Sequence, residues 1–357
     1  MMNNINMILI KVCEKLNLSE SLYEKLKERY QKISEYLQTH PELNDVKIYP
    51  QGSISIGTTV KPISQDEYDL DFVCEKDGLN PFHLFTIIKE YLKNNGHYSE
   101  LVEEKKRCVR LNYKEKFHID ILPACSDKES LSQTGTSILI PDKELRSLLP
   151  SDPKGYSAWF WKKSKEVYKR DAEIEALPQY QQASQKNYLQ CIVQLMKRHR
   201  DIFFQHKQEH SPPSIIITTL CGNYYTSQRS IPDGLTNIVN TIKINPTPKV
   251  YNPINSEELL SEKWEENPIL YNSFRTWIDS LYTDLQSLKD ANNIEEKLKE
   301  MFGEKIVNPI LDELKKRSLI HTNRKNLSVT STGILSSTQN ENNTPVRQNT
   351  FYGIEED

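Results

Sequence analysis

The stretch Tyr49-Pro50-Gln51-Gly52-Ser53, followed by Glu67-Tyr68-Asp69-Leu70-Asp71-Phe72-Val73, decides the fold. Its second half alternates apolar and acidic side chains, a period of two residues that predicts a β-strand. Strand geometry turns Asp69 and Asp71 to the same face, about 7 Å apart along the chain. Two carboxylates at this spacing repel each other, so we expect a cation between them. Divalent cations that also carry a substrate phosphate are the usual partners of such a pair.

A third carboxylate, Asp120, lies in another alternating run at residues 117–122. Ile119 and Ile121 face one side of this predicted strand and Asp120 faces the other. Taken alone, each aspartate is compatible with an ordinary solvent-facing strand position. Together, the three favour two-metal phosphoryl chemistry. In that interpretation Asp69 and Asp71 bridge two Mg²⁺ ions, and Asp120 is either a metal ligand or the base for the attacking hydroxyl.

The Gly52-Ser53 turn fits the other half of such a site. Glycine lets the backbone approach a phosphate closely, and successive N–H groups together with the Ser53 hydroxyl can cradle a triphosphate. A Gly-Ser pair alone carries little information, but it gains specificity when Gly57-Thr58 and an Asp-x-Asp strand follow. The sequence has no G-x-x-x-x-G-K-[ST] motif, so a P-loop NTPase is not supported.

Composition narrows the class of protein. The 357 residues are enough for two lobes or one elaborated domain. The net charge of −3 gives no global basic field for binding long nucleic acids. The six cysteines are scattered without a C-x-x-C pair, which favours reduced thiols and a cytoplasmic location over disulfides or a zinc site. No apolar run approaches 18 residues, so neither membrane spanning nor secretion is expected.

Periodicity predicts the order of the elements. The expected helices are 5–16, 19–39 with Ser19 as N-cap, a short one near 55–60, 81–95, 155–170 and 183–205, and the expected strands are 46–49, 68–74, 108–113 and 117–122. Most of the chain from there to about residue 315 is predicted to be helical. Residues 322–350 are rich in Asn, Ser, Thr and Gln, which predicts a flexible tail.

In helix 183–205, at 100° per residue, Arg200 falls within the apolar stripe and Lys197 at its edge. We expect Arg200 to form an internal ion pair, with Asp201 among the candidate partners, or else to point into the site. Lys197 is either a solvated edge residue or a phosphate ligand. His199 is expected to be a packed or surface histidine rather than a catalytic base.

These features resemble the polymerase-β-like nucleotidyltransferases, and more narrowly the bacterial cGAS/DncV-like nucleotidyltransferases (CD-NTases) of the CBASS anti-phage systems. Further stretches that carry the resemblance are Phe117-His118-Ile119-Asp120-Ile121-Leu122-Pro123-Ala124, Ile138-Leu139-Ile140-Pro141-Asp142, Asp152-Pro153-Lys154-Gly155-Tyr156, Gln194-Leu195-Met196-Lys197-Arg198-His199-Arg200-Asp201 and Pro212-Pro213-Ser214-Ile215-Ile216-Ile217-Thr218-Thr219-Leu220. The segment from Asn252 to Trp264 also resembles part of the oligoadenylate-synthetase-like half, but its middle departs from the family pattern. The role of this segment is therefore open.

The resemblance implies an α+β fold with two lobes. One is a polymerase-β-like nucleotidyltransferase lobe, a small mixed sheet with flanking helices, and the other is a helical, oligoadenylate-synthetase-like C-terminal lobe. We expect residues 1–180 to hold the N-terminal helices and the catalytic lobe. Residues 181–320 should form the helical lobe, and 321–357 the flexible tail.

The resemblance also implies a site, residue by residue. The matching positions form a catalytic and metal-binding triad, a triphosphate-binding turn and two further nucleotide contacts. These are Asp69, Asp71 and Asp120 for the triad, Gln51, Gly52 and Ser53 for the turn, and Lys197 and Ser214 for the contacts. The implied cofactor is a pair of Mg²⁺ ions, for which Mn²⁺ can substitute.

The implied activity is condensation of ATP, GTP, UTP or CTP into a cyclic di- or trinucleotide, a second messenger for a separate effector in antiviral defence. Ubiquitin-like conjugation machinery is a candidate partner of the tail. Double-stranded DNA is not expected as an activator, since the zinc-ribbon insertion of the animal DNA sensor is missing and the net charge is negative. Two alternatives remain open: a transferase of the same fold that adds a nucleotide to RNA, protein or a small molecule, and a non-enzymatic nucleotide-binding module.

Overall fold

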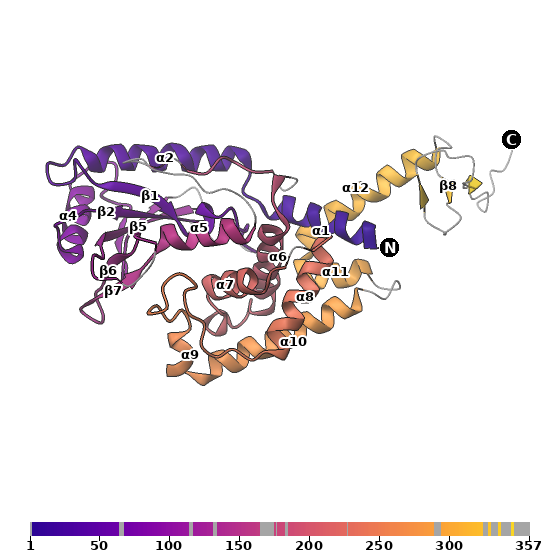
Figure 1. The fold of residues 1–357 in the computed structure, drawn as a ribbon. Coiled ribbons are helices and arrows are strands. Elements are labelled where there is room, and N and C mark those ends of the chain that lie inside the picture. The colour runs from indigo at the N-terminus through magenta and orange to yellow at the C-terminus, as the bar shows by residue number, and fades with distance from the viewer. Residues whose placement is uncertain are drawn as a thin grey trace.

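The computed structural model describes residues 2–63, 68–113, 117–130, 134–164, 175, 177–182, 185–226, 228–288 and 294–323, and the short segments 328–329, 335–336 and 344–345. A sheet lobe and a helical lobe lie side by side along the long axis of the molecule (Figure 1). The predicted α+β class with a helical second lobe is confirmed.

The sheet lobe is built on a seven-stranded mixed sheet with the central order β1-β2-β5-β4-β3. The strands are β1 (Lys47–Gln51), β2 (Tyr68–Glu75), β3 (Val102–Glu104), β4 (Val109–Tyr113), β5 (Phe117–Ser126), β6 (Ile138–Asp142) and β7 (Ser147–Ser151). Strands β2 and β5 pair in parallel, and the other pairs of this sheet are antiparallel.

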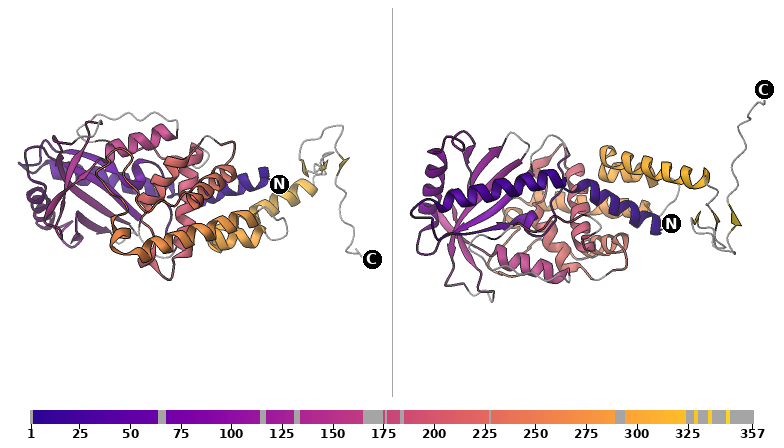
Figure 2. Two further views of the ribbon diagram at one scale, coloured as in Figure 1. Left: turned by 60° about the horizontal axis from the view of Figure 1, so that its bottom comes forward. Right: turned by 90° about the horizontal axis from the view of Figure 1, so that it is seen from above.

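Apolar alternation decides which face of the sheet is buried. Leu70 and Phe72 of β2 share one core with Ile119 and Ile121 of β5. Helices α2 (Glu20–Gln38) and α4 (Pro81–Lys93) cover this face, and Figures 1 and 2 show α2 running along it. A slip of one residue would turn every side chain of a strand over, so burial of this face fixes which residues the other face presents. Helix α5 (Pro153–Lys163) lies on the other side (Figure 1).

The local signals in the sequence explain most boundaries. Ser19 is the N-cap of α2, as predicted, because its side chain accepts a hydrogen bond from the Leu22 amide. Asn80 caps α4 in the same way. The predicted strands at 46–49, 68–74, 108–113 and 117–122 are confirmed as β1, β2, β4 and β5. Strands β3, β6 and β7 were not predicted. Strand β3 has only three residues, and a proline interrupts the alternation in each of β6 and β7.

Three predicted helices need correction. The short helix expected near 55–60 is α3 (Gly52–Ser55), and it stops early because Gly57 adopts a left-handed backbone with φ 66°. The helix expected at 155–170 begins at Pro153, after the N-cap Asp152, and ends at Lys163, while 165–170 lie outside the described residues. The helix expected at 183–205 begins only at Tyr188, since a capping box at Asn187 starts it there.

The helical lobe surrounds α6 (Tyr188–Phe203), whose residues 189–199 are all buried. The other helices are α7 (Ser214–Tyr224), α8 (Ile231–Ile244), α9 (Glu262–Glu266), α10 (Pro268–Ser287), α11 (Ile294–Phe302) and α12 (Glu304–Asn323), with a 3₁₀ turn η2 (Gln208–His210). None of the helices in the described ranges has the length and apolar character needed to span a membrane.

The first helix, α1 (Met2–Leu16), corrects the boundary drawn at residue 180. Leu9, Val12 and Leu16 are fully buried in the core of the helical lobe rather than in that of the sheet lobe. Figure 2 shows α1 beside the helices of that lobe. Residues 1–180 therefore do not form one unit, because the apolar face of α1 needs the C-terminal helices to cover it.

The predicted tail at 321–357 lies largely outside the described residues. Within it the structure describes the end of α12 and three two-residue strands, β8 (Ser328–Val329), β9 (Leu335–Ser336) and β10 (Thr344–Pro345). These strands pair as a small antiparallel sheet.

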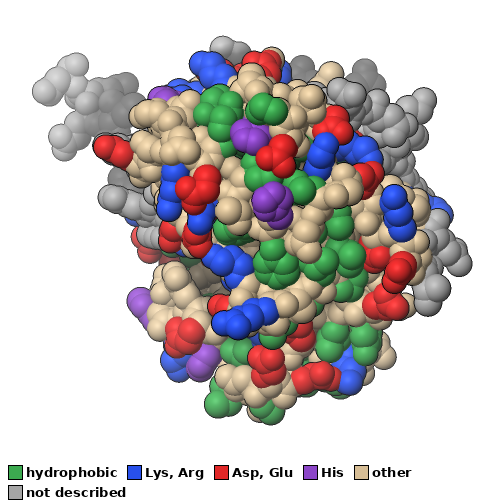
Figure 3. Space-filling model, turned by 90° about the vertical axis from the view of Figure 1, so that its left-hand side faces the viewer, with side chains coloured by type: hydrophobic (Ala, Val, Ile, Leu, Met, Phe, Trp, Pro, Cys, Tyr) green, Lys and Arg blue, Asp and Glu red, His purple; other side chains and the backbone are tan. Residues whose placement is uncertain are grey.

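Acidic and basic side chains are interleaved over the end of the sheet lobe that Figure 3 shows. In this lobe Lys89 and Lys143 both pair with Glu104, and Lys106 pairs with Glu144. Charges of opposite sign in such pairs cancel locally, so this face carries no extended field of one sign among the residues drawn in colour.

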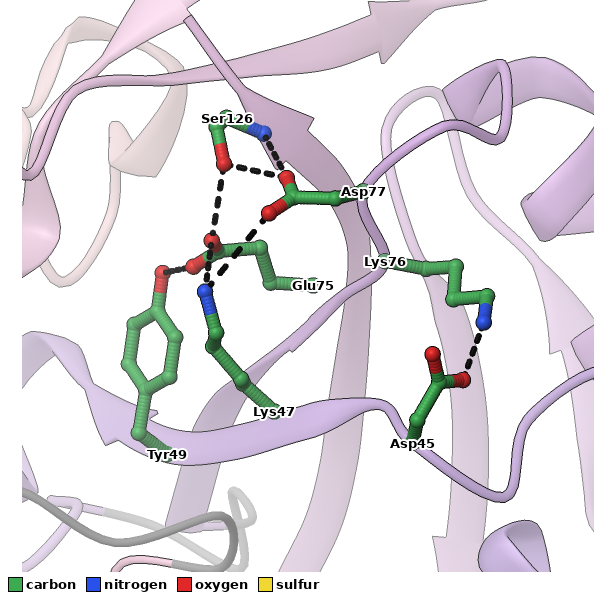
Figure 4. A network of polar contacts seen from close by, with 7 residues as sticks. All are labelled: Asp45, Lys47, Tyr49, Glu75, Lys76, Asp77 and Ser126. Atoms are coloured by element: carbon green, nitrogen blue, oxygen red, sulfur yellow. Dashed lines mark hydrogen bonds and ion pairs between the residues drawn. The ribbon is translucent and has the colours of Figure 1, made fainter.

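A polar network ties three strands together at the end of the sheet away from Asp69 and Asp71 (Figure 4). The Tyr49 hydroxyl of β1 donates to Glu75 Oε2 of β2 over 2.9 Å. The Ser126 hydroxyl of β5 donates to Glu75 Oε1 over 3.3 Å, and the Ser126 amide donates to Asp77 Oδ1 over 3.2 Å. Lys47 completes the network through a 3.4 Å ion pair with Glu75. Burial, followed by the charge of Glu75, raises the pKa of Tyr49 well above its ordinary value, so this hydroxyl remains a donor.

We expect Tyr49→Phe to lower the free energy of unfolding by about 1.5–3 kcal/mol, because it leaves a buried carboxylate without a charge-assisted hydrogen bond. The phenylalanine ring can keep the contact with the Lys154 ammonium, which lies 4.0 Å from the Tyr49 ring centroid. Chemical denaturation measures the change. As a control, Lys47→Met should cost less than about 1 kcal/mol, since Lys47 is 49% exposed. Equal losses for both variants would contradict this account.

Candidate active site

One row of residues crosses the sheet at the site. Gln51 of β1 pairs with Asp71 of β2, Asp71 with Asp120 of β5, and Asp120 with Arg110 of β4. Side chains opposite one another on paired strands share a face, and neighbouring strands lie about 4.8 Å apart. The register therefore puts Asp71 and Asp120 side by side. Asp69 stands on the same face, two residues before Asp71 and opposite His118.

The two outer carboxylates of the triad have partners. Arg110 grips Asp120 with two parallel bonds, Nε to Oδ1 and Nη2 to Oδ2, each 2.7 Å long. His118 pairs with Asp69 through its Nε2. Both partners come from residues on the same face of the sheet, so the site partly neutralises its own acidic charge.

Asp71, in the middle, has no hydrogen-bond donor among the described residues. Burial, then the negative charges of Asp69 and Asp120, raise the pKa of Asp71 to about 7. Arg110 and His118 lower this pKa, but by less than burial and the two carboxylates raise it. A bound cation would add the positive charge that an ionised Asp71 needs.

The triad offers Mg²⁺ the oxygens of three carboxylates from one face of the sheet. Within the described ranges, no three His, Cys, Asp or Glu residues gather closely enough to hold a metal ion. Arg110 is bonded to both oxygens of Asp120, and His118 is paired with Asp69. Three carboxylates with oxygen donors only are nonetheless the ligand type that Mg²⁺ and Mn²⁺ prefer.

The Gly52-Ser53 turn lies directly against Asp71. Gly52 has a left-handed backbone with φ 64°, and a Cβ added there would lie 2.6 Å from Asp71 Oδ2. Only glycine therefore fits at this position. The Ser53 hydroxyl shares a 3.1 Å hydrogen bond with Thr59 Oγ1.

A cleft of ≈ 890 Å³ lies between the two lobes and gathers most of the predicted site. Its lining includes Gln51, Gly52, Ser53, Asp69, Asp71, Lys197 and Ser214. Asp120 is not among the lining residues and instead lies next to Asp71 within the sheet, held by Arg110. The structure thus brings all eight predicted positions to one place, and their catalytic and binding roles remain predictions.

Lys197 lies on the cleft wall but is only 5% exposed, so the solvated-edge alternative is wrong. Its Nζ donates to the carbonyl and to the hydroxyl of Thr58, both over 3.2 Å. Burial, then the positive charge of Arg200, lower the pKa of Lys197 to about 7. A buried ammonium with no carboxylate in its hydrogen bonds is well suited to an incoming anion.

The predicted internal ion pair of Arg200 is confirmed, since Arg200 Nε lies 2.8 Å from Asp201 Oδ1. Arg200 also lines the cleft and donates through Nη1 to Ser214 Oγ over 2.9 Å and to the Pro212 carbonyl over 3.0 Å. It therefore fixes Ser214 at the start of α7.

His199 is a packed histidine, as predicted. The Trp277 indole donates to His199 Nδ1 over 2.9 Å, so the hydrogen of a neutral ring is on Nε2, 2.9 Å from Asp284 Oδ2. Both ring nitrogens are thus occupied inside the helical lobe.

Three residues of the site were not predicted from the sequence: Arg110, His118 and Glu258. Glu258 lines the cleft from the loop before α9. The first two had a signal, because each is a basic residue on the acidic face of an alternating strand. Glu258 had none, since its position depends on the packing of a loop far along the chain.

Comparisons with known proteins show the family to which the chain belongs. The model of the Second Messenger Oligonucleotide or Dinucleotide Synthetase domain matches residues 2–164. A protein of Roseivirga ehrenbergii named c-di-GMP synthase is 34% identical over 367 residues, covering 97% of this chain and 96% of that protein. The chain belongs to the CD-NTases. It is therefore a nucleotidyltransferase, and the purely binding alternative is wrong.

Solved structures of other CD-NTases share the fold. The Bradyrhizobium diazoefficiens CD-NTase CdnG, in complex with GTP, has a TM-score of 0.70 at 21% identity, covering 87% of this chain and 99% of that one. Vibrio cholerae DncV, a cyclic AMP-GMP synthase solved with a linear intermediate, has a TM-score of 0.57 at 17% identity. The match covers 86% of this chain and 91% of that one.

We expect Gly52→Ala to reduce the nucleotidyltransferase activity of this CD-NTase by at least about 100-fold, because the new methyl group would displace Asp71. Release of pyrophosphate measures the loss. Gly78→Ala is the matched control, since Gly78 also has a positive φ, 78°, but nothing lies within 4 Å of its added Cβ. The control should lose about 1–2 kcal/mol of stability and keep its activity. Similar activity in both variants would refute the role of this close approach.

Lys197→Met should stabilise the nucleotide-free CD-NTase and weaken nucleotide binding by about 10- to 100-fold. The pKa of Lys197 falls from 10.5 to about 7 on folding, so the unfolded chain holds this proton more tightly. The resulting cost is fully present below pH 7 and disappears as the pH rises toward 10.5. The gain in melting temperature of K197M should therefore be largest below pH 7.

Melting curves between about pH 6 and pH 10, with and without GTP, test this expectation. Lys243→Met is the control, because Lys243 lies near the surface in an ion pair with Asp279 and should show no such gain. A K197M variant that melts earlier than the wild type at low pH would show that the buried charge is not a cost.

Proposed function

We propose that this CD-NTase condenses two nucleoside triphosphates, GTP among them, into a cyclic dinucleotide with release of pyrophosphate. The observation that carries the proposal is the row of carboxylates beside the Gly52-Ser53 turn. Asp69, Asp71 and the turn line one cleft, and Asp120 lies next to Asp71. The volume of ≈ 890 Å³ is near the upper end of small-molecule sites. The names of the relatives support a dinucleotide: c-di-GMP synthase in one, cyclic dinucleotide synthase CdnG in another that is 22% identical over 342 residues.

Each part of the site has a distinct task in this proposal. The amide groups of the Gly52-Ser53 turn, the Ser53 hydroxyl and Lys197 Nζ bind the triphosphate of the donor nucleotide. Its negative charge favours the ammonium form of Lys197, which burial disfavours in the free protein. Arg200 holds Ser214 in place at the start of α7.

Asp69, Asp71 and Asp120 would hold two Mg²⁺ ions, which neutralise phosphate charge and make the acceptor hydroxyl more acidic when bound. Arg110 orients Asp120 beside Asp71, and His118 orients Asp69. Catalysis by these residues is mostly positioning and charge neutralisation. A second reaction of the same kind, on the linear intermediate, closes the ring.

We place the product in anti-phage signalling of the CBASS type, as a second messenger for a separate effector in the cytoplasm. The family supports this context, and the tail that conjugation machinery would use lies largely outside the described residues. The interleaved charges of Figure 3 offer no basic face for a double-stranded DNA activator on that side of the molecule.

Incubation with all four NTPs and Mg²⁺ or Mn²⁺, then phosphatase treatment and mass spectrometry, tests the proposal. We expect a phosphatase-resistant dinucleotide that disappears with EDTA and falls by at least about 100-fold in Asp71→Asn. Asp45→Asn, which removes the charge of an exposed residue paired with Lys76, is the control and should leave the yield unchanged. Nucleotide transfer only after addition of RNA or a small acceptor would instead establish the alternative transferase activity.

A further inference from the structure

The loop at residues 250–261 forms a rigid part of the cleft wall. Its two arms are joined by hydrogen bonds from the Asn252 amide to the Glu258 carbonyl, 2.9 Å, and from the Leu260 amide to the Val250 carbonyl, 2.8 Å. Two side chains of the loop itself, Asn252 and Asn255, are buried. Glu258 and Leu260 both line the cleft, so the loop presents a fixed surface to whatever the cleft binds.

Only one of the two carboxylate oxygens of Glu258 accepts a hydrogen bond from a described residue. Oε2 accepts a 2.8 Å hydrogen bond from Asn252 Nδ2, which fixes the orientation of the side chain. Oε1 has no hydrogen-bond donor among the described residues. Burial raises the pKa of Glu258, and the nearby charges of Arg107, Asp152 and Glu262 act more weakly and with opposite signs. Glu258 is half-buried, and its Oε1 therefore stands at the cleft as an acceptor to which no described residue donates.

The neighbouring acid does not share this property. Asp152 also lines the cleft, but both of its oxygens are occupied. Oδ1 accepts from the Thr136 hydroxyl, 2.7 Å, and the Gly155 amide, 2.8 Å, and Oδ2 accepts from the Thr134 hydroxyl, 2.5 Å. Its task is to begin α5. Among the acids at this part of the cleft, Glu258 is thus the one with an acceptor to spare.

We propose that Glu258 reads the base of a bound nucleotide and selects guanine, by accepting hydrogen bonds from its N1–H and N2–H groups. A carboxylate repels phosphates, and the phosphate-binding groups lie at the Gly52-Ser53 turn, Lys197 and Ser214. The parts of a nucleotide that can donate to Glu258 are therefore the ribose hydroxyls and the base, and we assign the base. A contact with the ribose, which GTP and ATP share, would not change the ratio of their affinities. The inference rests on the proposed function, because it assumes that the cleft holds nucleoside triphosphates.

The hydrogen-bonding edges of the bases account for the selectivity. Guanine offers two adjacent donors, which match the lone pairs of a carboxylate. At the same two places adenine presents the lone pair of its N1 and the C–H group of its C2. It therefore loses both hydrogen bonds, and its N1 lone pair repels the carboxylate. A site built to bond a donor rejects the analogue that lacks it more strongly than an apolar pocket rejects a small change in size.

Glu258→Gln tests the inference, with Glu257→Gln as matched control. The glutamine carbonyl can still accept from Asn252 Nδ2, so the loop should keep its shape, and Glu257 is the exposed neighbour that does not line the cleft. Equilibrium dialysis with GTP and with ATP gives the binding preference of each protein. We expect E258Q to lower the preference for GTP over ATP by at least about 10-fold, and E257Q to leave it unchanged.

Product analysis with an equimolar mixture of GTP and ATP provides a second readout. The rise in KM for GTP should exceed the fall in kcat, and more adenine should enter the product of E258Q. An unchanged preference in both measurements would overturn the inference. Glu258→Asp keeps the charge, so if the melting temperature of E258Q falls, retained guanine preference in E258D decides for the inference and equal loss decides against it.

The two proposals fail separately. A wild-type protein that forms no cyclic dinucleotide contradicts the proposed function, while the ratio of GTP to ATP binding in wild type and E258Q still decides the role of Glu258. A wild type that makes a guanine-containing product with the same base preference as E258Q contradicts only the role of Glu258.

Discussion

The parallel pairing of β2 with β5 is the constraint on which the rest of the site depends. It places Asp71 directly beside Asp120, although 48 residues separate them in the sequence (positions 72 to 119). Parallel strands need a long crossover, and here α4 with the strands β3 and β4 forms it. The apolar residues on the opposite face hold this register, since a slip of one residue would bury the aspartates under α2. Core packing on one face thus determines the chemistry on the other.

The site also contains one buried acidic group and one buried basic group whose charged forms are unfavourable in the free protein. Asp71 is crowded by like charges, and Lys197 is buried without a carboxylate in its hydrogen bonds. Burial moves the pKa of each group to about 7, from opposite directions. A magnesium-bound triphosphate would relieve both, because the cation meets the carboxylate and the phosphates meet the ammonium. The free energy lost in the empty protein is then recovered on binding, which favours the substrate complex over the free state.

The strands that carry the three aspartates could be predicted from the sequence, whereas the end of α3 and the position of α1 could not. The alternation around Asp69, Asp71 and Asp120 was enough to predict their strands and shared face, since period-2 burial is a local property. The extent of α3 depended on a positive φ at Gly57, and the placement of α1 on a partner surface near the other end of the chain. Burial of Lys197 was equally out of reach, because the residues that cover it come from other elements. Long-range packing decides such features, and a single sequence does not display it.

The placement of α1 gives the molecule an interleaved topology. The chain begins in the helical lobe, crosses into the sheet lobe at α2, and returns at α6, with Lys11 of α1 bound to Glu313 of α12 over 3.1 Å. Two covalent crossings therefore join the lobes, one on each side of the sheet lobe in the sequence. The helical lobe therefore cannot be cut out as one continuous fragment, because α1, which supplies part of its core, is separated from α6 by the whole sheet lobe. A fragment that begins at α6 would leave the apolar surface that α1 covers exposed to water.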